Sequence, residues 1–266
     1  VNAEQALSAH ALVSGWSVFH YETFDYPEFA GPCSGMYVIA TTHRSGSSWL
    51  CRELWRTSCL GAPHEYFNRL RGILPLATRF GAVDGAAYLN ALIEHRTSPN
   101  GVFAIKALYG HWRVAKMMLE SCSRIPNSIK FIFLDRRDKA AQAVSLARAR
   151  QTQQWTSLGG LGSCAKYDAA RIRRALMDLR GQRSRWLAEF KTSEVTPLVL
   201  TYEDLLADMS GCVEAIASHI GVDLSRERPL DLPLLVIQRD DNSADWLTRF
   251  KLEEAQFLAA FDDETD

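Results

Sequence analysis

The stretch "MYVIATTHRSGSSWLCRELW" (residues 36–55) decides the fold class of this chain. It opens with an apolar run typical of a buried strand, crosses a short turn with one glycine and several hydroxyls, and continues with helical apolar spacing at Leu50, Leu54 and Trp55. A glycine-containing turn between a strand and a helix presents backbone N–H groups at the helix N-terminus, which favours an anion. The sequence therefore predicts an α/β protein with an anion site after this strand.

The same rhythm of strand and helix continues along the chain. Strands are expected at 36–42, 101–108, 129–135 and 197–205, and helices at 47–58, 111–122, 138–155, 167–190 and 209–222. Short apolar strands that alternate with amphipathic helices indicate a parallel sheet with helices on both faces. We predict a P-loop-like α/β fold in one domain over 36–266. Residues 1–35 read as an N-terminal extension or loop region, in which 2–16 could form a short helix.

Composition excludes several classes of protein. A formal net charge of -1 over 266 residues argues against a nucleic-acid binder that works through bulk charge. The six cysteines form no CxxC pair, so free thiols in a reducing compartment are expected. No apolar run approaches the ~20 residues that cross a bilayer. We predict a cytoplasmic protein without integral membrane association and, because no ligand spacing for zinc, calcium or magnesium occurs, without a metal.

Ligands of parallel sheets bind beyond the carboxyl ends of the strands, so the residues there are candidates for the site. After the first strand, Arg44 adds a forked positive charge and Ser45, Ser47 and Ser48 add hydroxyl donors. An ordinary helix cap is the alternative reading of these serines. The stretch is not a Walker A loop, which counts against ATPase or GTPase chemistry.

A second strand end carries charge as well. Arg136 and Arg137 follow the strand 129–135, and Ser145 lies nine residues after Arg136 in the next helix. A second anion, held apart from the first, is the functional interpretation. A solvated charge run, with Asp135 and Asp138 as partners of the arginines, is the alternative.

Both strand ends resemble a known family. The motif T-x-R-S-G-S-S-W resembles the loop that binds the 5′-phosphosulfate in sulfotransferases that use 3′-phosphoadenosine 5′-phosphosulfate (PAPS), and Arg136 with Ser145 resembles their 3′-phosphate site. The chain is most similar to the bacterial trehalose 2-sulfotransferase (Stf0-like) family. That likeness is carried by "HRSGSSWL" (43–50), "GAPHEYFN" (61–68), "NGVFAIKAL" (100–108), "RRDKAAQAVSLARARQTQQW" (136–155) and "QRDDNSADWLTRF" (238–250).

The resemblance implies PAPS as the donor, 3′-phosphoadenosine 5′-phosphate (PAP) as the product, and no metal. The donor site would be formed by Arg44, Ser45, Gly46, Ser47, Ser48, Trp49, Arg136 and Ser145. Arg44 would lie near the bridging oxygen and offset the charge that develops there. Trp49 matches a tryptophan that stacks on adenine, with a place in the hydrophobic core as its alternative.

The resemblance also implies a base for the acceptor hydroxyl. Glu65 matches the family's catalytic glutamate, and His64 beside it is a rival base with a suitable ordinary pKa. Neighbouring side chains of an extended segment point in opposite directions, and we expect Glu65 to face the donor. A pKa raised towards neutral by burial would suit this role. The family's sugar-associated glutamate is replaced by Ala62, which puts trehalose itself in doubt.

Further residues are candidates for the acceptor side of the site. Lys106 ends a strand and matches a family lysine, so it would contact the sulfuryl group or the acceptor; a lysine whose tip reaches solvent is the alternative. His64, His111 and Trp112 are the candidates for binding the acceptor, and His111 and Trp112 are expected to line its pocket. Arg239 and Trp246 fall where sulfotransferases place a loop over the nucleotide, and Trp155 matches the family without an assignable role.

The sequence thus predicts a sulfotransferase that modifies a hydroxyl of a carbohydrate or glycoconjugate. The acceptor would be a small molecule or a glycolipid, and the resemblance implies a homodimer. Two alternatives stay open: a nucleotide-dependent kinase, which shares the strand–loop–helix anion site, and a catalytically inactive nucleotide-binding protein.

Overall fold

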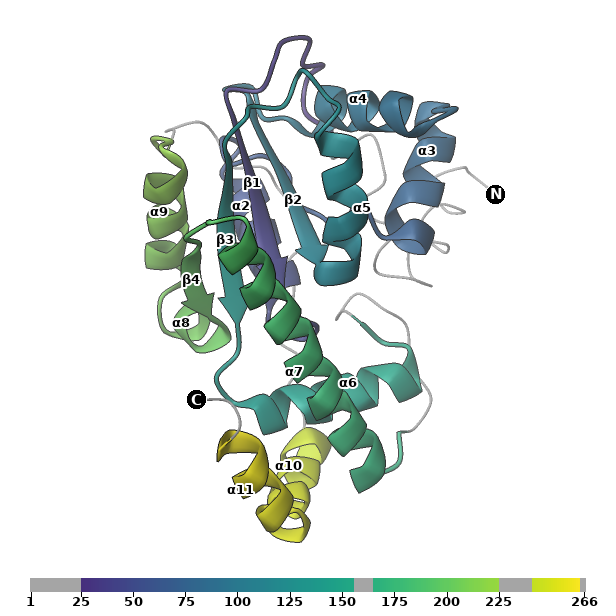
Figure 1. Ribbon diagram of the computed structural model, residues 1–266, viewed down its shortest axis with the longest axis vertical. Helices are drawn as coiled ribbons and strands as arrows, with labels where there is room; N and C mark the ends of the chain where they lie inside the picture. The colour runs from purple at the N-terminus through teal and green to yellow at the C-terminus, as the bar shows by residue number, and fades with distance from the viewer. Residues whose placement is uncertain (1–24, 156–164, 225–240, 264–266) are drawn as a thin grey trace, which may run out of the picture.

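The computed structural model describes residues 25–155, 165–224 and 241–263. The elements (Figure 1) are, in chain order, β1 (Gly35–Thr41), α2 (Ser47–Arg56), η3 (Arg69–Ile73), α3 (Leu74–Phe80), α4 (Gly85–Arg96), β2 (Val102–Leu108), α5 (Tyr109–Leu119), β3 (Ile129–Asp135), α6 (Lys139–Thr152), α7 (Ala169–Thr192), β4 (Leu198–Thr201), α8 (Tyr202–Ala207), α9 (Met209–Ile220), α10 (Asp241–Glu253) and α11 (Ala255–Asp263). Within these residues, none of the helices combines the length and apolarity needed to span a membrane.

The strands form one parallel sheet in the order β2-β1-β3-β4. Met36 of β1 is in register with Phe103 of β2 on one side and Ile129 of β3 on the other. Because all strands run the same way, their carboxyl ends meet at one edge of the sheet. The predicted parallel α/β fold is confirmed.

Helices cover both faces of this sheet, as predicted. Alternate side chains of β1 point to opposite faces: Tyr37 and Ile39 pack with residues of α2 and α9, whereas Val38 and Ala40 pack with residues of α4, α5 and α7. A strand that is covered on both faces has no polar face, which is why the sequence of β1 is continuously apolar rather than alternating.

The last predicted strand is wrong beyond Thr201. Instead of continuing through Leu205, the chain turns into α8 at Tyr202. The Thr201 hydroxyl accepts a hydrogen bond from the backbone N–H of Asp204, and the Asp204 carboxylate accepts one from the backbone N–H of Thr201. This capping box stabilises a helix start and ends the strand.

Residues 25–34 pack against the domain without regular structure. Asp25 forms ion pairs with Arg79 and Arg96, and the buried Tyr26 donates a hydrogen bond to the carbonyl of Gly61. At the other end of the molecule, α10 and α11 lie beside α6 and α7 (Figure 1). Residues of α10 thereby reach the carboxyl edge of the sheet, where the site lies.

Candidate active site

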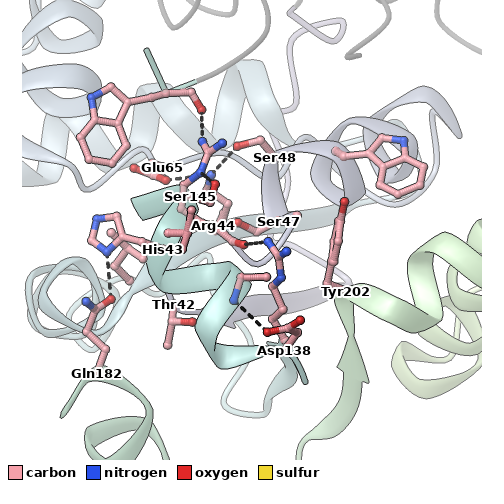
Figure 2. Close-up of a pocket in the computed structure, with 18 of the residues that line it drawn as sticks. Thr42, His43, Arg44, Ser47, Ser48, Glu65, Asp138, Ser145, Gln182 and Tyr202 are labelled. Atoms are coloured by element: carbon pink, nitrogen blue, oxygen red, sulfur yellow. Dashed lines mark hydrogen bonds and ion pairs between the residues drawn. The ribbon is translucent and has the colours of Figure 1, made fainter. Parts of the chain in front are cut away.

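A cavity of about 830 Å³ opens at the carboxyl ends of the strands. Its walls come from the loop after β1, the end of β2, the loop after β3, the start of α8, and side chains of α6, α7 and α10. Most of the residues singled out from the sequence line it: Arg44, Gly46, Ser47, Ser48, Trp49, Glu65, Lys106, His111, Arg136, Ser145 and Trp155 (Figure 2 shows several of them). Segments that are far apart in the sequence therefore meet in one cavity, as the strand-end rule predicts.

The loop after β1 has the backbone of an anion-binding turn. Arg44 and Gly46 both adopt left-handed φ angles, of 62° and 81°. Gly46 is the N-cap residue of α2, and because glycine has no side chain it leaves the first-turn N–H groups of that helix without a side-chain cap of its own. These N–H groups and the positive end of the helix dipole favour an anion in the cavity.

Gly46→Ala is expected to lower the free energy of unfolding by about 1–3 kcal/mol. Alanine disfavours the left-handed φ, and its Cβ would lie 2.6 Å from Cδ2 of Tyr202. Thermal unfolding would register the loss as roughly 2–12 °C. The control is Gly181→Ala within α7, where the new Cβ would meet no neighbouring side chain or other segment within 4 Å. Its unfolding temperature should stay at the wild-type value or rise. A Gly46→Ala protein with the wild-type transition would rule out this loop conformation.

Arg44 connects the two predicted anion sites. Its Nε donates to Oγ of Ser145 at 2.9 Å, and its Nη1 donates to the carbonyl of Trp155 at 2.6 Å. Nη1 of Arg136 donates to the backbone carbonyl of Arg44 at 3.3 Å. Burial, with the nearby positive charge of Arg136, lowers the pKa of Arg44 to about 10, so the guanidinium stays charged at neutral pH.

A buried ion pair lies beside this loop. Nζ of Lys106 is 2.8 Å from Oε1 of Glu65 and donates to Oγ of Ser48 at 3.1 Å. The two side chains are only 3% and 10% exposed. Asn68 donates to Oε2 of Glu65 at 3.4 Å, and Nδ1 of His111 lies 3.9 Å from the same oxygen. Lys106 therefore links the carboxylate to the first turn of α2, and its ammonium does not reach out to solvent.

These neighbours decide the protonation state of Glu65. Burial alone would raise its pKa, but the positive charge of Lys106, with smaller contributions from His111 and His43, holds the pKa below its ordinary value. For His111, burial lowers the pKa although Glu65 opposes it. Glu65 is thus a carboxylate at neutral pH, and the raised pKa that would suit a general base is absent from this state of the site.

The structure separates the two rival bases as the alternation rule predicts. Glu65 lines the cavity, whereas the His64 ring is buried and meets the ring of Tyr66 edge-on at 5.7 Å. The backbone carbonyl of His64 accepts a hydrogen bond from the N–H of Lys106. This contact holds the loop against β2 and fixes which side chain faces the cavity.

Several residues predicted for the site do not line the cavity, His64 among them. Trp112 is wrong as a pocket residue: it is a core residue of α5, and its Nε1 donates to Glu189 of α7 at 3.0 Å. The side chain of Ser45 is buried, and its Oγ lies 2.5 Å from Oγ1 of Thr41 instead of facing the cavity. Trp246 stands on α10 and meets the ring of Tyr167 edge-on. Arg239 lies outside the described residues.

Sequence reasoning missed several cavity residues, among them His43, Tyr202 and Gln182, described here, and Asn68, Arg71 and Arg185. His43 lies within the quoted turn, and its Nδ1 is 3.0 Å from Oε1 of Gln182 on α7. Tyr202 follows β4, and its ring lies 4.6 Å from the guanidinium carbon of Arg136. The strand-end rule could have found Tyr202 and His43. Nothing in the sequence marks Gln182, because it stands mid-helix among polar residues.

Fold and site together define a class: an α/β protein whose glycine loop at the edge of the sheet is suited to an anion and lies beside a buried carboxylate. The comparison with protein families identifies a particular family within that class. The model of the family described as Stf0 sulphotransferase matches residues 36–253, and the chain belongs to this family. It is therefore a transferase, and its activity is that of a sulfotransferase.

Two relatives with similar sequences agree with this assignment. A trehalose 2-sulfotransferase of Mycobacterium tuberculosis is 28% identical over 258 residues, which cover 82% of this chain and 94% of that protein. A trehalose 2-sulfotransferase of Mycolicibacterium smegmatis is 25% identical over 256 residues, covering 81% and 94%. Among solved structures, the sulfotransferase domain from the curacin biosynthetic pathway matches with a TM-score of 0.47 and 16% identity, over 85% of this chain and 99% of that one.

Proposed function

We propose that this enzyme transfers a sulfuryl group from PAPS to a hydroxyl of a carbohydrate or glycoconjugate, with Glu65 as the general base. The observation that carries the proposal is the shared cavity of the Gly46 loop and the Glu65–Lys106 pair. A single side chain, Lys106, hydrogen-bonds both the carboxylate and Ser48 of the anion loop. An acceptor hydroxyl at Glu65 would thus lie next to a sulfuryl group held at α2.

The donor fits the charges of the cavity. PAPS carries its negative charge in two clusters, at the 5′-phosphosulfate and at the 3′-phosphate. Arg44 and the N-terminus of α2 would hold the first, and Arg136 the second, with the indole of Trp49 available to the adenine. The hydrogen bond from Arg136 to the Arg44 carbonyl ties the Arg136 guanidinium to the backbone of the donor loop.

In the proposed reaction the acceptor oxygen bonds to sulfur while the bond from sulfur to the 5′-phosphate oxygen breaks. The electron pair stays on the phosphate oxygen, where Arg44 offsets the new charge, and the hydroxyl proton passes to Glu65. Sulfuryl transfer resembles phosphoryl transfer, in which positioning and charge stabilisation supply most of the rate. A base with a low pKa is sufficient for such a step, since the proton leaves an oxygen that has become acidic through bonding to sulfur.

Thermal unfolding with PAP, with ATP plus magnesium, and with neither tests the donor. A ligand at about one hundred times its dissociation constant stabilises by roughly 2.7 kcal/mol, or about 5–10 °C here. PAP is expected to give this shift and ATP plus magnesium a smaller one, because only PAP carries the 3′-phosphate.

Arg136→Ala should remove the shift by PAP. Arg137→Ala is its matched control, because Arg137 stands next along the chain but is exposed and pairs with Glu203 and Asp204. An equal or larger thermal shift by ATP plus magnesium would contradict PAPS as the donor and would favour a nucleotide-dependent kinase.

A further inference from the structure

A continuous series of side chains forms one wall of the cavity. The guanidinium carbon of Arg71 lies 5.3 Å from the centre of the Trp155 ring, and this ring lies 5.9 Å from the ring of His43. His43 is joined to Gln182 of α7 by the contact of 3.0 Å between Nδ1 and Oε1. We call Arg71, Trp155, His43 and Gln182 the acceptor wall. All four line the cavity, although they come from four separate segments.

The acceptor wall is joined to the donor loop by the hydrogen bond from Arg44 to the Trp155 carbonyl, and it lies on the opposite side of Arg44 from Tyr202. Figure 2 shows His43 and Gln182 on one side of Arg44 and Tyr202 on the other. Tyr202 carries the guanidinium of Arg136 over its ring, which places the proposed 3′-phosphate site on that other side. A molecule at the acceptor wall would therefore reach the centre of the cavity without crossing the proposed 3′-phosphate site.

The wall meets the proposed base through one residue. The side-chain amide of Asn68 donates to Glu65 through its Nδ2, and its Oδ1 accepts the backbone N–H of Arg71 at 3.1 Å. The same oxygen accepts the N–H of Leu70 and caps the start of η3. Asn68 thereby fixes the position of the Arg71 backbone relative to the Glu65 carboxylate.

Two arginines make this side of the cavity cationic. The indole of Trp155 supports the Arg71 guanidinium by a cation–π contact. Burial lowers the pKa of Arg71 although Glu65 opposes it, and a guanidinium remains protonated at neutral pH. Arg185 lies three residues after Gln182, on the same face of α7, and also lines the cavity. Its side chain is exposed and makes no ion pair among the residues that the structure describes, so it can turn towards a ligand.

The neutral members of the wall suit hydroxyl groups. Burial lowers the pKa of His43, and its ring is neutral at pH 7. With Nδ1 donating to Gln182, Nε2 is left as an acceptor. A planar guanidinium, in contrast, matches a carboxylate or phosphate through two parallel hydrogen bonds, and a hydroxyl uses only one of them.

We propose that the acceptor of this sulfotransferase is an anionic carbohydrate, whose carboxylate, phosphate or sulfate ester is bound by Arg71 and Arg185 while a hydroxyl lies at Glu65. The proposal rests on the proposed function and adds the chemical class of the acceptor. Asn68, His43 and Gln182 bind hydroxyls of the same molecule.

The test compares acceptors that differ by one anionic group. Transfer of sulfate from PAPS to trehalose and to trehalose 6-phosphate is measured with the full chain, and glucose with glucuronate forms a second pair. The anionic member of a pair is expected to have a kcat/KM at least about tenfold higher, mainly through KM. This preference should weaken as salt is raised, because salt screens the ion pairs.

A double variant, Arg71→Gln with Arg185→Gln, should reduce the preference to near unity while the thermal shift by PAP stays as in wild type. Arg174→Gln, at an exposed position of α7 outside the cavity, is the control and should keep the preference. Two results would contradict the anionic acceptor and leave the proposed function standing. One is an equal kcat/KM for both members of each pair, and the other is no transfer to any anionic sugar by protein that binds PAP. Loss of the PAP shift in the double variant would show that Arg71 and Arg185 bind the donor, and this result would also contradict the anionic acceptor. Absence of a PAP shift in wild type contradicts the proposed function itself.

Discussion

Glu65→Gln is expected to lower kcat for sulfuryl transfer by about 10²–10⁴, the usual contribution of a positioned base. The amide keeps the shape of the side chain, but it has one acceptor oxygen for two donors, Lys106 and Asn68, and it cannot take the hydroxyl proton. Steady-state rates with PAPS and an accepted hydroxyl compound measure the loss. The thermal shift by PAP should be kept, because Glu65 lies on the acceptor side of the donor loop.

Glu189→Gln is the matched control for this variant. Glu189 is a partly buried glutamate that accepts hydrogen bonds from Trp112 and Lys116 outside the cavity, so its loss perturbs structure without touching the proposed chemistry. A Glu65→Gln enzyme with wild-type kcat would remove Glu65 as the base. His111 and His43, which lie near it, would then be the groups to test.

Lys106→Met is expected to destabilise the fold by about 3–5 kcal/mol, because it leaves Glu65 as an unpaired buried carboxylate. The transition should fall by roughly 6–20 °C. The matched control is Lys116→Met, which breaks the ion pair with Glu189 at a lysine that is 43% exposed. Such a surface pair contributes only about 0–1 kcal/mol. Equal effects of the two variants would contradict the buried character of the Glu65–Lys106 pair.

The double variant Glu65→Gln with Lys106→Met separates charge from packing. Since both charges are removed together, it should be more stable than Lys106→Met alone, yet inactive. The pH dependence has a defined sign. The pKa of folded Glu65 lies below the ordinary 4.5, so its stabilisation is present above that pH and is lost as the pH falls through the lower folded value. Acid unfolding of Glu65→Gln should lack this component.

An anionic acceptor and a carboxylate base would carry charges of the same sign within one cavity. Glu65 carries a negative charge that would repel an anionic acceptor, but Lys106 neutralises it at 2.8 Å. Arg71 and Arg185 can then determine which sugars bind. Selectivity and catalysis would be separable by mutation, since the arginines act on KM and Glu65 acts on kcat.

The sequence by itself determined the parallel α/β class, the four strands as far as Thr201, the five helices predicted within 47–222 and the position of the glycine loop at a strand end, because each depends on local periodicity or on the backbone that glycine permits. The helices α3, α4, α10 and α11 were not predicted. The choice of Glu65 over His64 came from the family resemblance, since alternation says only that one of the two faces the cavity. The same local reasoning failed at Tyr202, where a capping box that involves only Thr201 and Asp204 ended the strand early.

Only the tertiary structure decided the chemistry of the residues that were found. The pKa of Glu65 is lowered because Lys106 of β2 lies against this carboxylate, whose pKa burial alone would have raised. Trp112 does not line the cavity; its side chain lies in the core, where Glu189 of α7 accepts a hydrogen bond from its Nε1–H. Gln182 joined the cavity because α7 packs beside the loop of His43. Charge, burial and hydrogen-bond partners arise from segments that are distant in the chain, and no local pattern encodes them.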